Sequence, residues 1–252
     1  MDRKVAFFID GNFYIKRLGF FARKYFSSRK ILPQQAIYIL RDIIHYHESK
    51  CGSRDRYRSY YYDAPPLDVQ QKFPLPLPGH RTPPTKNFKS DPNYVFQHEL
   101  HKHLGEERKM ALRMGKLSNH RTWQIKSPVL TKLIKKEIEF DSLTNDDFYL
   151  DVRQKGVDTR IGMDITYLTL RGFVDTIILI ASDADFVPVA KLARTNGVDV
   201  IIDPLHADTV DKDLLQHIDG RHSCDLVSEL SKVFHENPSP RPAWWKSSQT
   251  TK

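Results

Sequence analysis

Long apolar runs and cysteines are both scarce in this sequence. No apolar run approaches the ~20 residues that a membrane-spanning helix needs, and the longest, around residues 176–181, has the length of a strand. The apolar stretch near the N-terminus ends at Asp10, which is too early for a signal peptide. The two cysteines, Cys51 and Cys224, are far apart, which argues against a disulfide framework and a Cys-rich zinc site. We therefore expect a cytoplasmic protein without a membrane segment.

Several motifs of nucleotide and metal chemistry are also missing. The sequence contains neither G-x-x-x-x-G-K-[ST] nor G-x-G-x-x-G, so nucleotide hydrolysis and a dinucleotide cofactor lack support. An aspartyl-phosphate enzyme would need an Asp-x-Asp pair after the first strand, but Gly11 and Asn12 follow Asp10. His98 and His101 could share a helical face, but the spacing is not H-E-x-x-H and no further ligand is evident. We favour surface histidines over a zinc site.

Positive and negative charges are separated along the chain, whose formal net charge is +8. Lys and Arg outnumber Asp and Glu by 14 to 7 in residues 1–80 and by 13 to 4 in residues 81–136, whereas residues 137–230 hold 8 basic and 19 acidic residues. A protein that only binds a phosphate backbone does not need a dense acidic block. A metal-dependent nuclease needs both signs, because carboxylates hold the cation and basic groups hold the polyanion. A solvated surface of mixed charge is the alternative.

Apolar periodicity predicts an α/β fold. Short β-type runs predict strands over residues 4–9, 56–62, 121–126, 148–153, 175–181, 198–202 and 223–226. Amphipathic patterns predict helices over residues 13–26, 34–47, 92–116, 129–139, 158–170, 186–195 and 211–217. This alternation predicts a Rossmann-like parallel sheet with helices on both faces.

The domain organisation follows from composition. We expect one domain over residues 1–236, with its core in 3–63 and 147–227 and a basic insertion over 64–146. Seven prolines within about twenty residues predict that the insertion begins as a loop or flexible arm with polyproline tendency, and its next part is expected to be helical. The Pro- and Ser-rich tail, residues 237–252, is expected to be disordered, with packing of its tryptophans against the domain as the alternative.

Acidic residues follow the expected strands at the places where a parallel sheet binds ligands. Asp10 follows the first strand, Asp158 precedes a long helix, and Asp183 and Asp185 follow the DTIILIA strand. Gathering these acids costs repulsion unless a cation is present. Hard divalent cations prefer oxygen ligands, so we expect a Mg²⁺ or Mn²⁺ site that activates water for phosphodiester hydrolysis.

Each acid also has an ordinary structural reading. Asp10 could be a turn residue before Gly11, while Asp158 and Asp185 could be helix N-caps. Capping explains Asp183 less well, because it lies before that cap. Asp164 is six residues past Asp158, so the two lie about 120° apart on a helix. They share a site only if Asp158 lies in the turn before the helix, and we rank Asp164 as supporting.

Three segments together resemble the LabA-like branch of the NYN domain family, within the PIN-like nuclease superfamily. The resemblance covers roughly residues 3–63 and 147–227, and it is carried by the runs VAFFIDGN, QKGVDTRIGMDITYL and DTIILIASDADFVPVAKLARTNGVDVIIDPL. It implies a Rossmann-like sheet and metal-dependent RNA cleavage. It also implies metal and catalytic roles for the family's acids, which fall on Asp10, Asp158, Asp164, Asp183 and Asp185.

Two further positions of the family pattern are polar. Ser182 matches a small polar position that could orient a ligand or water. Many members place an asparagine three residues after the first aspartate, whereas here Phe13 occupies that position and Asn12 lies one position earlier. Residues 64–146 match the family only loosely, so the choice of substrate is not implied by the resemblance.

Basic and aromatic residues are candidates for binding the substrate. Helical Lys and Arg could hold phosphates, and an aromatic ring such as Trp123 or Tyr94 could stack an unpaired base. The alternative is a solvated helix whose long side chains cover apolar surface. The candidate phosphate ligands are Lys102, Arg108, Lys109, Arg113, Lys116, Arg121, Lys155 and Arg160.

Three hypotheses follow. The first is an RNA endonuclease in which Asp10, Asp158 and Asp183 hold one or two Mg²⁺ or Mn²⁺ ions, with Asp164 and Asp185 in support; single-stranded DNA is a second possible substrate. The second is a non-catalytic RNA-binding module in which the acids are structural. The third is an interaction protein that docks partners through the Pro-rich arm and the tail. A protein partner or a homo-oligomer is possible under each hypothesis.

Overall fold

The computed structural model describes residues 3–27, 30–52, 55–207 and 210–245. Its internal contacts divide the chain into two compact units. The first unit comprises residues 1–63, 99–115 and 156–252, and the second comprises residues 64–98 and 116–155. All five acids that the sequence selects belong to the first unit.

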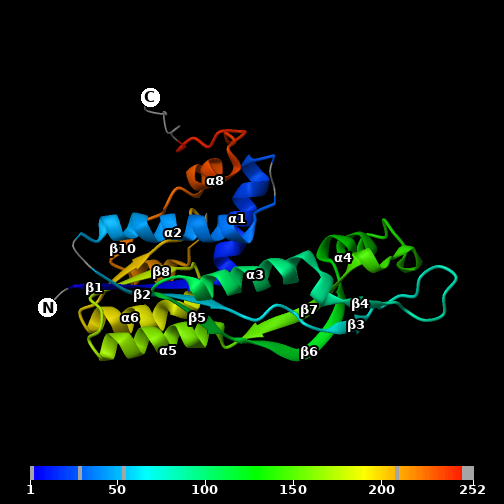
Figure 1. The fold of residues 1–252 in the computed structure, drawn as a ribbon. Helices are drawn as coiled ribbons and strands as arrows, with labels where there is room; N and C mark the ends of the chain where they lie inside the picture. The colour runs from blue at the N-terminus through cyan, green and yellow to red at the C-terminus, as the bar shows by residue number, and fades with distance from the viewer. Residues whose placement is uncertain (1–2, 28–29, 53–54, 208–209, 246–252) are drawn as a thin grey trace. The chain divides into compact units, whose positions relative to one another are not determined.

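A six-stranded, entirely parallel sheet forms the centre of the first unit (Figure 1). Its order is β10-β9-β8-β1-β2-β5. These strands are β1 (Lys4–Asp10), β2 (Asp55–Asp63), β5 (Met110–Met114), β8 (Thr176–Ile180), β9 (Asp199–Ile202) and β10 (Gly220–Arg221). The order runs outward from β1 through β2 on one side and from β8 on the other, so the topological switch point lies between β1 and β8. Ligands of such sheets bind beyond the carboxyl ends of the strands at this point.

Helices cover both faces of this sheet. Figure 1 shows α1 (Gly11–Tyr25), α2 (Pro33–Lys50) and α8 (Leu226–Phe234) on one face, with α5 (Val157–Leu170) and α6 (Val187–Thr195) on the other. The short helix α7 (Lys212–Gln216) and the 3-10 turn η4 (Ala184–Phe186) complete the connections around β8 and β9. Residues 5–9 of β1 have no exposed surface, because a central parallel strand is buried on both faces. The expected α/β fold with a parallel sheet and flanking helices is confirmed.

The second unit contains two antiparallel pairs. One pair joins β3 (Gln70–Lys72) to β4 (Thr85–Asn87), and the other is a longer ribbon of β6 (Lys116–Ile125) and β7 (Phe148–Lys155). The unit also contains α4 (Ser127–Ile134), η1 (Phe88–Ser90), η2 (Phe140–Ser142), η3 (Asn145–Asp147) and the first part of α3 (Pro92–Glu106). The segment expected as a loop or flexible arm includes the short pair β3–β4, and Trp123 of β6 packs against it: its indole stacks on Phe73 at 5.3 Å and donates to the Lys72 carbonyl at 2.7 Å.

Several expected elements differ from the observed ones. The helix expected over residues 92–116 ends at Glu106, and Met110–Met114 forms β5, because this segment pairs with β2 at the edge of the sheet. The strands expected at 121–126 and 148–153 pair with each other in the ribbon instead of joining the sheet. A strand expected over 223–226 is absent from these described residues, since β10 precedes them and α8 begins at Leu226.

The described part of the C-terminal segment is packed. The Trp244 indole stacks on His206 at 5.5 Å and meets the Tyr25 ring edge-on at 6.4 Å. The Ser239 amide donates to the Tyr25 carbonyl at 2.7 Å. The tail was expected to be disordered from residue 237, whereas these contacts hold residues 239–244 against the domain; residues 246–252 lie outside the described residues.

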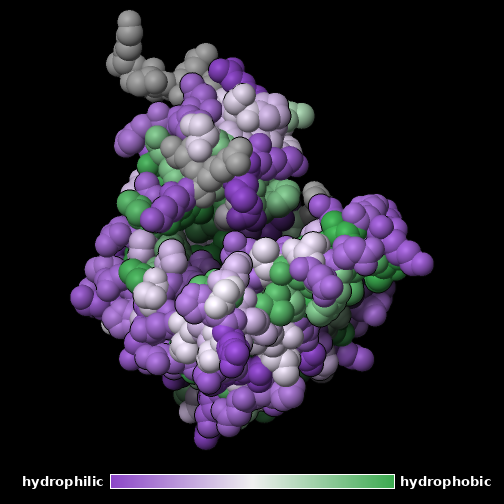
Figure 2. All heavy atoms as spheres, turned by 90° about the vertical axis from the view of Figure 1, so that its right-hand side faces the viewer, coloured by the Kyte–Doolittle hydropathy of each residue, from purple (hydrophilic) through white to green (hydrophobic). Residues whose placement is uncertain are grey.

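Within the described ranges, no helix combines the length and apolarity needed to cross a membrane. Hydrophilic residues predominate on the face drawn in Figure 2, where the hydrophobic ones form separate groups among them. This pattern is ordinary for the surface of a folded domain.

Candidate active site

Asp10 lies at the carboxyl end of β1 and caps α1. Its Oδ1 accepts a hydrogen bond from the Phe13 amide at 3.0 Å, and its own backbone is extended. The next residue must be small, since a Cβ on Gly11 would lie 2.5 Å from the Tyr61 ring. The turn role that the sequence allows for Asp10 is therefore real. It uses one carboxylate oxygen and leaves the acid's burial and its neighbours unexplained.

Asp10 lies among other carboxylates. The pKa of Asp10 is raised to about 6: burial raises it most, the Asp158 and Asp63 carboxylates add to the rise, and the Phe13 and Asn12 amides oppose it. An acid with this environment carries its negative charge at a cost to the folded state. Such a cost is typical of functional sites more often than of surface positions.

Asp158 joins the acids of β1 to those of β8. It lies in the first turn of α5, where the N-cap is Gly156 with a φ of 75°, so Asp158 does not cap the helix. Partial desolvation raises the pKa of the Asp158 carboxyl, and Asp185 and Asp183 raise it further. The structure therefore brings together Asp10, Asp158, Asp183 and Asp185 from three separate segments.

The loop after β8 presents two exposed acids. Asp183 Oδ1 accepts a hydrogen bond from the Asp185 amide at 3.1 Å and so caps η4. The capping role suggested for Asp185 thus belongs to Asp183, because the chain makes a 3-10 turn before α6 begins. Ser182 precedes these acids and lines the same cavity as Asp183.

Asp164 is engaged by other side chains. The Tyr62 hydroxyl donates to Asp164 Oδ2 at 2.8 Å, and Arg113 Nε donates to the same oxygen at 3.0 Å. Asp164 contributes to neither the raised pKa of Asp10 nor that of Asp158. The structure therefore places Asp164 and Arg113, two residues selected for different roles, in one ion pair that connects α5 to β5.

A fifth acid of the cluster, Asp63, escaped the sequence analysis. It ends β2 with 2% of its surface exposed, and its carboxylate accepts a hydrogen bond from His101 Nε2 at 2.8 Å. The available signal was position alone, because Asp63 terminates a β-type run just as Asp10 does. The expectation that His101 is an ordinary surface histidine is wrong, since its ring also lies edge-on to the buried Tyr61.

The remaining candidates have diverse environments. Asn12 and Arg160 are exposed near the starts of α1 and α5, two residues from Asp10 and Asp158 respectively. Lys116 and Lys155 are exposed, and their Cα atoms pair directly across the ribbon of the second unit. The Trp123 ring already packs against Phe73, which limits its freedom to stack on a base.

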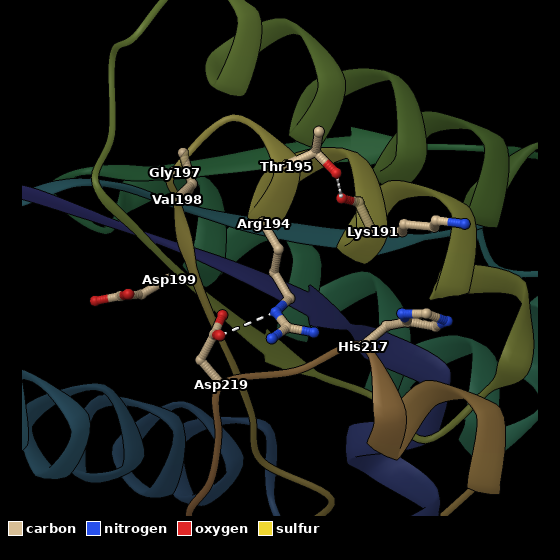
Figure 3. A pocket seen from close by; sticks show the side chains of 8 residues that line it. All are labelled: Lys191, Arg194, Thr195, Gly197, Val198, Asp199, His217 and Asp219. Atoms are coloured by element: carbon tan, nitrogen blue, oxygen red, sulfur yellow. Dashed lines mark hydrogen bonds and ion pairs between the residues drawn. The ribbon is translucent and has the colours of Figure 1, made fainter.

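Two cavities bear on the location of the site. The first, about 390 Å³, lies beside the start of β9, at the opposite end of the strands from the acids (Figure 3). Its Arg194 is paired with Asp219 at 2.9 Å and donates to the Gln216 carbonyl. The second, about 480 Å³, adjoins the acid cluster through Ser182 and Asp183. The position of the second cavity agrees with the switch point of the sheet.

Fold and site together define a parallel α/β protein with an acidic cluster at its topological switch point. Residues 107–217 match the NYN domain family, a match that includes Asp158, Asp164, Asp183 and Asp185 and leaves Asp10 and Asp63 outside. This family implies the PIN-like nuclease superfamily. The assignment to the LabA-like branch stays a prediction.

Other comparisons are less informative. No curated protein matches the chain. A crystal structure of a protein of unknown function from Vibrio parahaemolyticus aligns with a TM-score of 0.41 at 12% identity, covering 89% of this chain and 94% of that one.

Proposed function

We propose that this protein is a divalent-metal-dependent ribonuclease that hydrolyses single-stranded RNA at the cluster of Asp10, Asp158 and Asp183. The observation that carries the proposal is the raised pKa of Asp10, caused by burial and neighbouring carboxylates at the switch point of a parallel sheet. The match of residues 107–217 to the NYN family supports the same class of chemistry.

The donor set suits a hard divalent cation. Carboxylate oxygens are the ligands that Mg²⁺ and Mn²⁺ prefer, and a cation would relieve the repulsion among these acids. Among the residues that the structure describes, no three His, Cys, Asp or Glu side chains are close enough to hold one ion. Cation binding in this proposal therefore requires the acidic side chains to move closer together. A bound Mg²⁺ or Mn²⁺ would supply an activated water and charge neutralisation at phosphorus.

The residues of the chain have distinct tasks in this proposal. The cap on α1 engages Oδ1 of Asp10, and Oδ2 would be the metal ligand. Asp158 and Asp183 would supply carboxylates from the other two segments, and Asp185 would hold a metal-bound water. The exposed Arg160 guanidinium, two residues past Asp158, contacts a phosphate of the RNA.

The test is cleavage of a labelled single-stranded RNA by purified protein, with Mg²⁺, Mn²⁺ or EDTA. The Asp10→Asn/Asp183→Asn variant removes two charges from the cluster and retains acceptors for both caps. Asp175→Asn is the matched control, because Asp175 precedes β8 at the opposite end of the sheet and is exposed. We expect metal-dependent cleavage by wild type and the control, and a loss of at least about 100-fold in the double variant.

Other results would lead to different conclusions. Binding of RNA without cleavage, unaffected by the double variant, would favour the alternative of a non-catalytic RNA-binding module. Cleavage that persists in the double variant would place the active site elsewhere. A parallel assay with single-stranded DNA of the same sequence determines whether the ribose hydroxyl is required.

A further inference from the structure

A cavity of about 480 Å³ opens beside the acid cluster, between the loop after β8 and the start of α7. Its lining combines two segments: Ser182, Asp183 and Ala184 from the first, and Val210, Asp211 and Lys212 from the second. This volume lies within the range of roughly 300–1,000 Å³ that is usual for small-ligand sites. It is large enough for one nucleotide of a polymer that continues past Asp183.

One wall of this cavity carries Asp183, and the other carries Asp211 and Lys212. The Asp211 carboxylate is occupied by capping α7, since its Oδ1 accepts from the Asp213 amide at 2.8 Å and the Leu214 amide at 3.3 Å. Lys212 is exposed and has no ion-pair partner among the described residues. Lys212 is therefore available to an anion on this wall, between the capping Asp211 carboxylate and the exposed Asp213.

The wall that carries Lys212 is anchored through α7, and a separate contact holds residues 205–206; residues 208–209 between them lie outside the described residues. Leu214 of α7 is fully buried, and α7 packs against η4. Upstream, Arg17 of α1 donates to the carbonyls of Leu205 and His206, two residues with φ values of 47° and 51°. Non-glycine residues in this conformation cost free energy and persist only where their surroundings hold them. Lys212 is thus an exposed side chain on an anchored support.

We propose that this cavity is the subsite for the RNA nucleotide next to the scissile bond, and that Lys212 binds its phosphate. The inference rests on the proposed function and adds a substrate contact on the α7 side of the acid cluster. Because Asp183 lines this cavity, the next phosphate of an RNA bound here would reach the acid cluster. Lysine is suited to this task as a mobile point charge that does not require a fixed bidentate geometry.

The cavity in Figure 3 provides the contrast. Its Arg194 is paired with Asp219, and its Lys191 lies in the middle of α6. It also lies beside the start of β9, away from the acids. Lys191 is therefore a matched control for Lys212: an exposed lysine of the same unit that lines a cavity without a proposed role.

The experiment measures binding separately from cleavage. The probe is a fluorescently labelled single-stranded RNA in EDTA, and its Kd is determined by anisotropy at several salt concentrations for wild type, Lys212→Ala, Lys212→Arg and Lys191→Ala. We expect Lys212→Ala to weaken binding about 3- to 10-fold at low salt. Its slope of log K against log salt should shrink by about 0.7, because one phosphate contact is lost. Lys212→Arg and Lys191→Ala should bind like wild type.

Cleavage assays with the same variants separate the possible failures. Lys212→Ala should raise KM more than it lowers kcat, as expected for a lost binding contact. Wild-type affinity, salt slope and KM in Lys212→Ala would overturn this inference and leave the proposed nuclease intact. Weaker binding by Lys212→Ala, together with cleavage that persists in Asp10→Asn/Asp183→Asn, would support the subsite and overturn the assigned catalytic acids. Absence of RNA binding by wild type would overturn both.

Discussion

Two aspartates at the carboxyl ends of strands in one sheet have opposite environments. Asp203, directly after β9, has no exposed surface and is compensated on all sides. Its carboxylate accepts hydrogen bonds from His47 Nε2 at 2.8 Å, the Leu205 amide at 2.7 Å and the Cys224 amide at 3.3 Å. Asp10, at the end of β1, interacts with the Phe13 and Asn12 amides and has other carboxylates as neighbours.

The difference agrees with a structural role for Asp203 and with the functional role that we propose for Asp10. A buried carboxylate is tolerated when partners replace its hydration, and Asp203 has such partners. The Asp158 and Asp63 carboxylates raise the pKa of Asp10, so their proximity destabilises its charged form. Formation of the fold does not explain why these acids lie near one another. An unfavourable feature such as a group of mutually repelling carboxylates is expected at functional sites more often than elsewhere in a protein. The environment of Asp10 is therefore evidence about ligands, whereas that of Asp203 is evidence about stability.

Removal of the compensated acid should produce the largest change in stability. Asp203→Ala leaves the buried His47 imidazole and two amides without an acceptor, so we expect a loss of about 3–5 kcal/mol in the free energy of unfolding. Urea denaturation followed by circular dichroism measures it. Asp175→Ala, which removes an exposed acid at the opposite end of the sheet, should cost less than about 1 kcal/mol. Equal losses in the two variants would remove the distinction drawn for Asp203.

Removal of the uncompensated charge should have the opposite sign. The pKa of Asp10 is about 6 in the folded state against 3.8 for an ordinary aspartate, so the folded protein retains this proton between roughly pH 4 and 6. Ionisation of Asp10 therefore costs stability as the pH rises through 6, by roughly 1–3 kcal/mol at neutral pH. Asp10→Asn avoids that cost and preserves the cap.

Denaturation at several pH values measures the effect. We expect Asp10→Asn to be more stable than wild type at pH 7.5, with the advantage lost as the pH falls from 6 to 4. Added Mn²⁺ should stabilise wild type and leave the variant unchanged, since binding to the folded state alone raises stability. A variant that is less stable than wild type at every pH would mean that the Asp10 carboxylate is a structural group like Asp203.

The sequence predicted those features that depend on neighbours along the chain. Residues 4–9 were recognised as a buried strand because every residue from 5 to 9 is apolar, and α2 was recognised from its stripe of buried isoleucines and Leu40. Asp10, Asp158, Asp183 and Asp185 were selected because acids that follow strands or precede helices at the carboxyl edge are close in sequence to those signals. Their convergence then follows from the parallel topology.

Features that depend on distant partners were missed. The Asp63–His101 contact joins residues 38 positions apart, and the His47–Asp203 pair joins residues 156 apart, so no local pattern reveals either. Residues 110–114 were included in a helix expected over residues 92–116, but pairing with β2 determined their structure. The separation of Asp164 from the cluster likewise depends on Tyr62 and Arg113, which lie in other elements.

The same comparison extends to cations of the second unit, where the expected effects are smallest. Lys116 and Lys155 pair directly across the ribbon and form a like-charge pair, whereas Lys86 is paired with Asp91 at 2.9 Å. Like charges in directly opposite positions are mutually unfavourable, so Lys155→Ala should leave stability unchanged or raise it by a few tenths of a kcal/mol. Without its lysine, the ribbon should bind labelled RNA about 2- to 5-fold more weakly at low salt.

Lys86→Ala is the matched variant, since it removes one lysine from the same unit. It should lower stability by less than about 1 kcal/mol and leave RNA affinity unchanged, because Asp91 already neutralises that charge. Anisotropy and urea denaturation on the two variants test both quantities together. If Lys86→Ala weakened RNA binding as much as Lys155→Ala, total charge alone would govern the interaction. A loss of RNA affinity confined to Lys155→Ala would show that RNA contacts the lysine without an ion-pair partner among the described residues. The cations would then follow the rule proposed for Asp10 and Asp203, in which a side chain already compensated within the protein is structural.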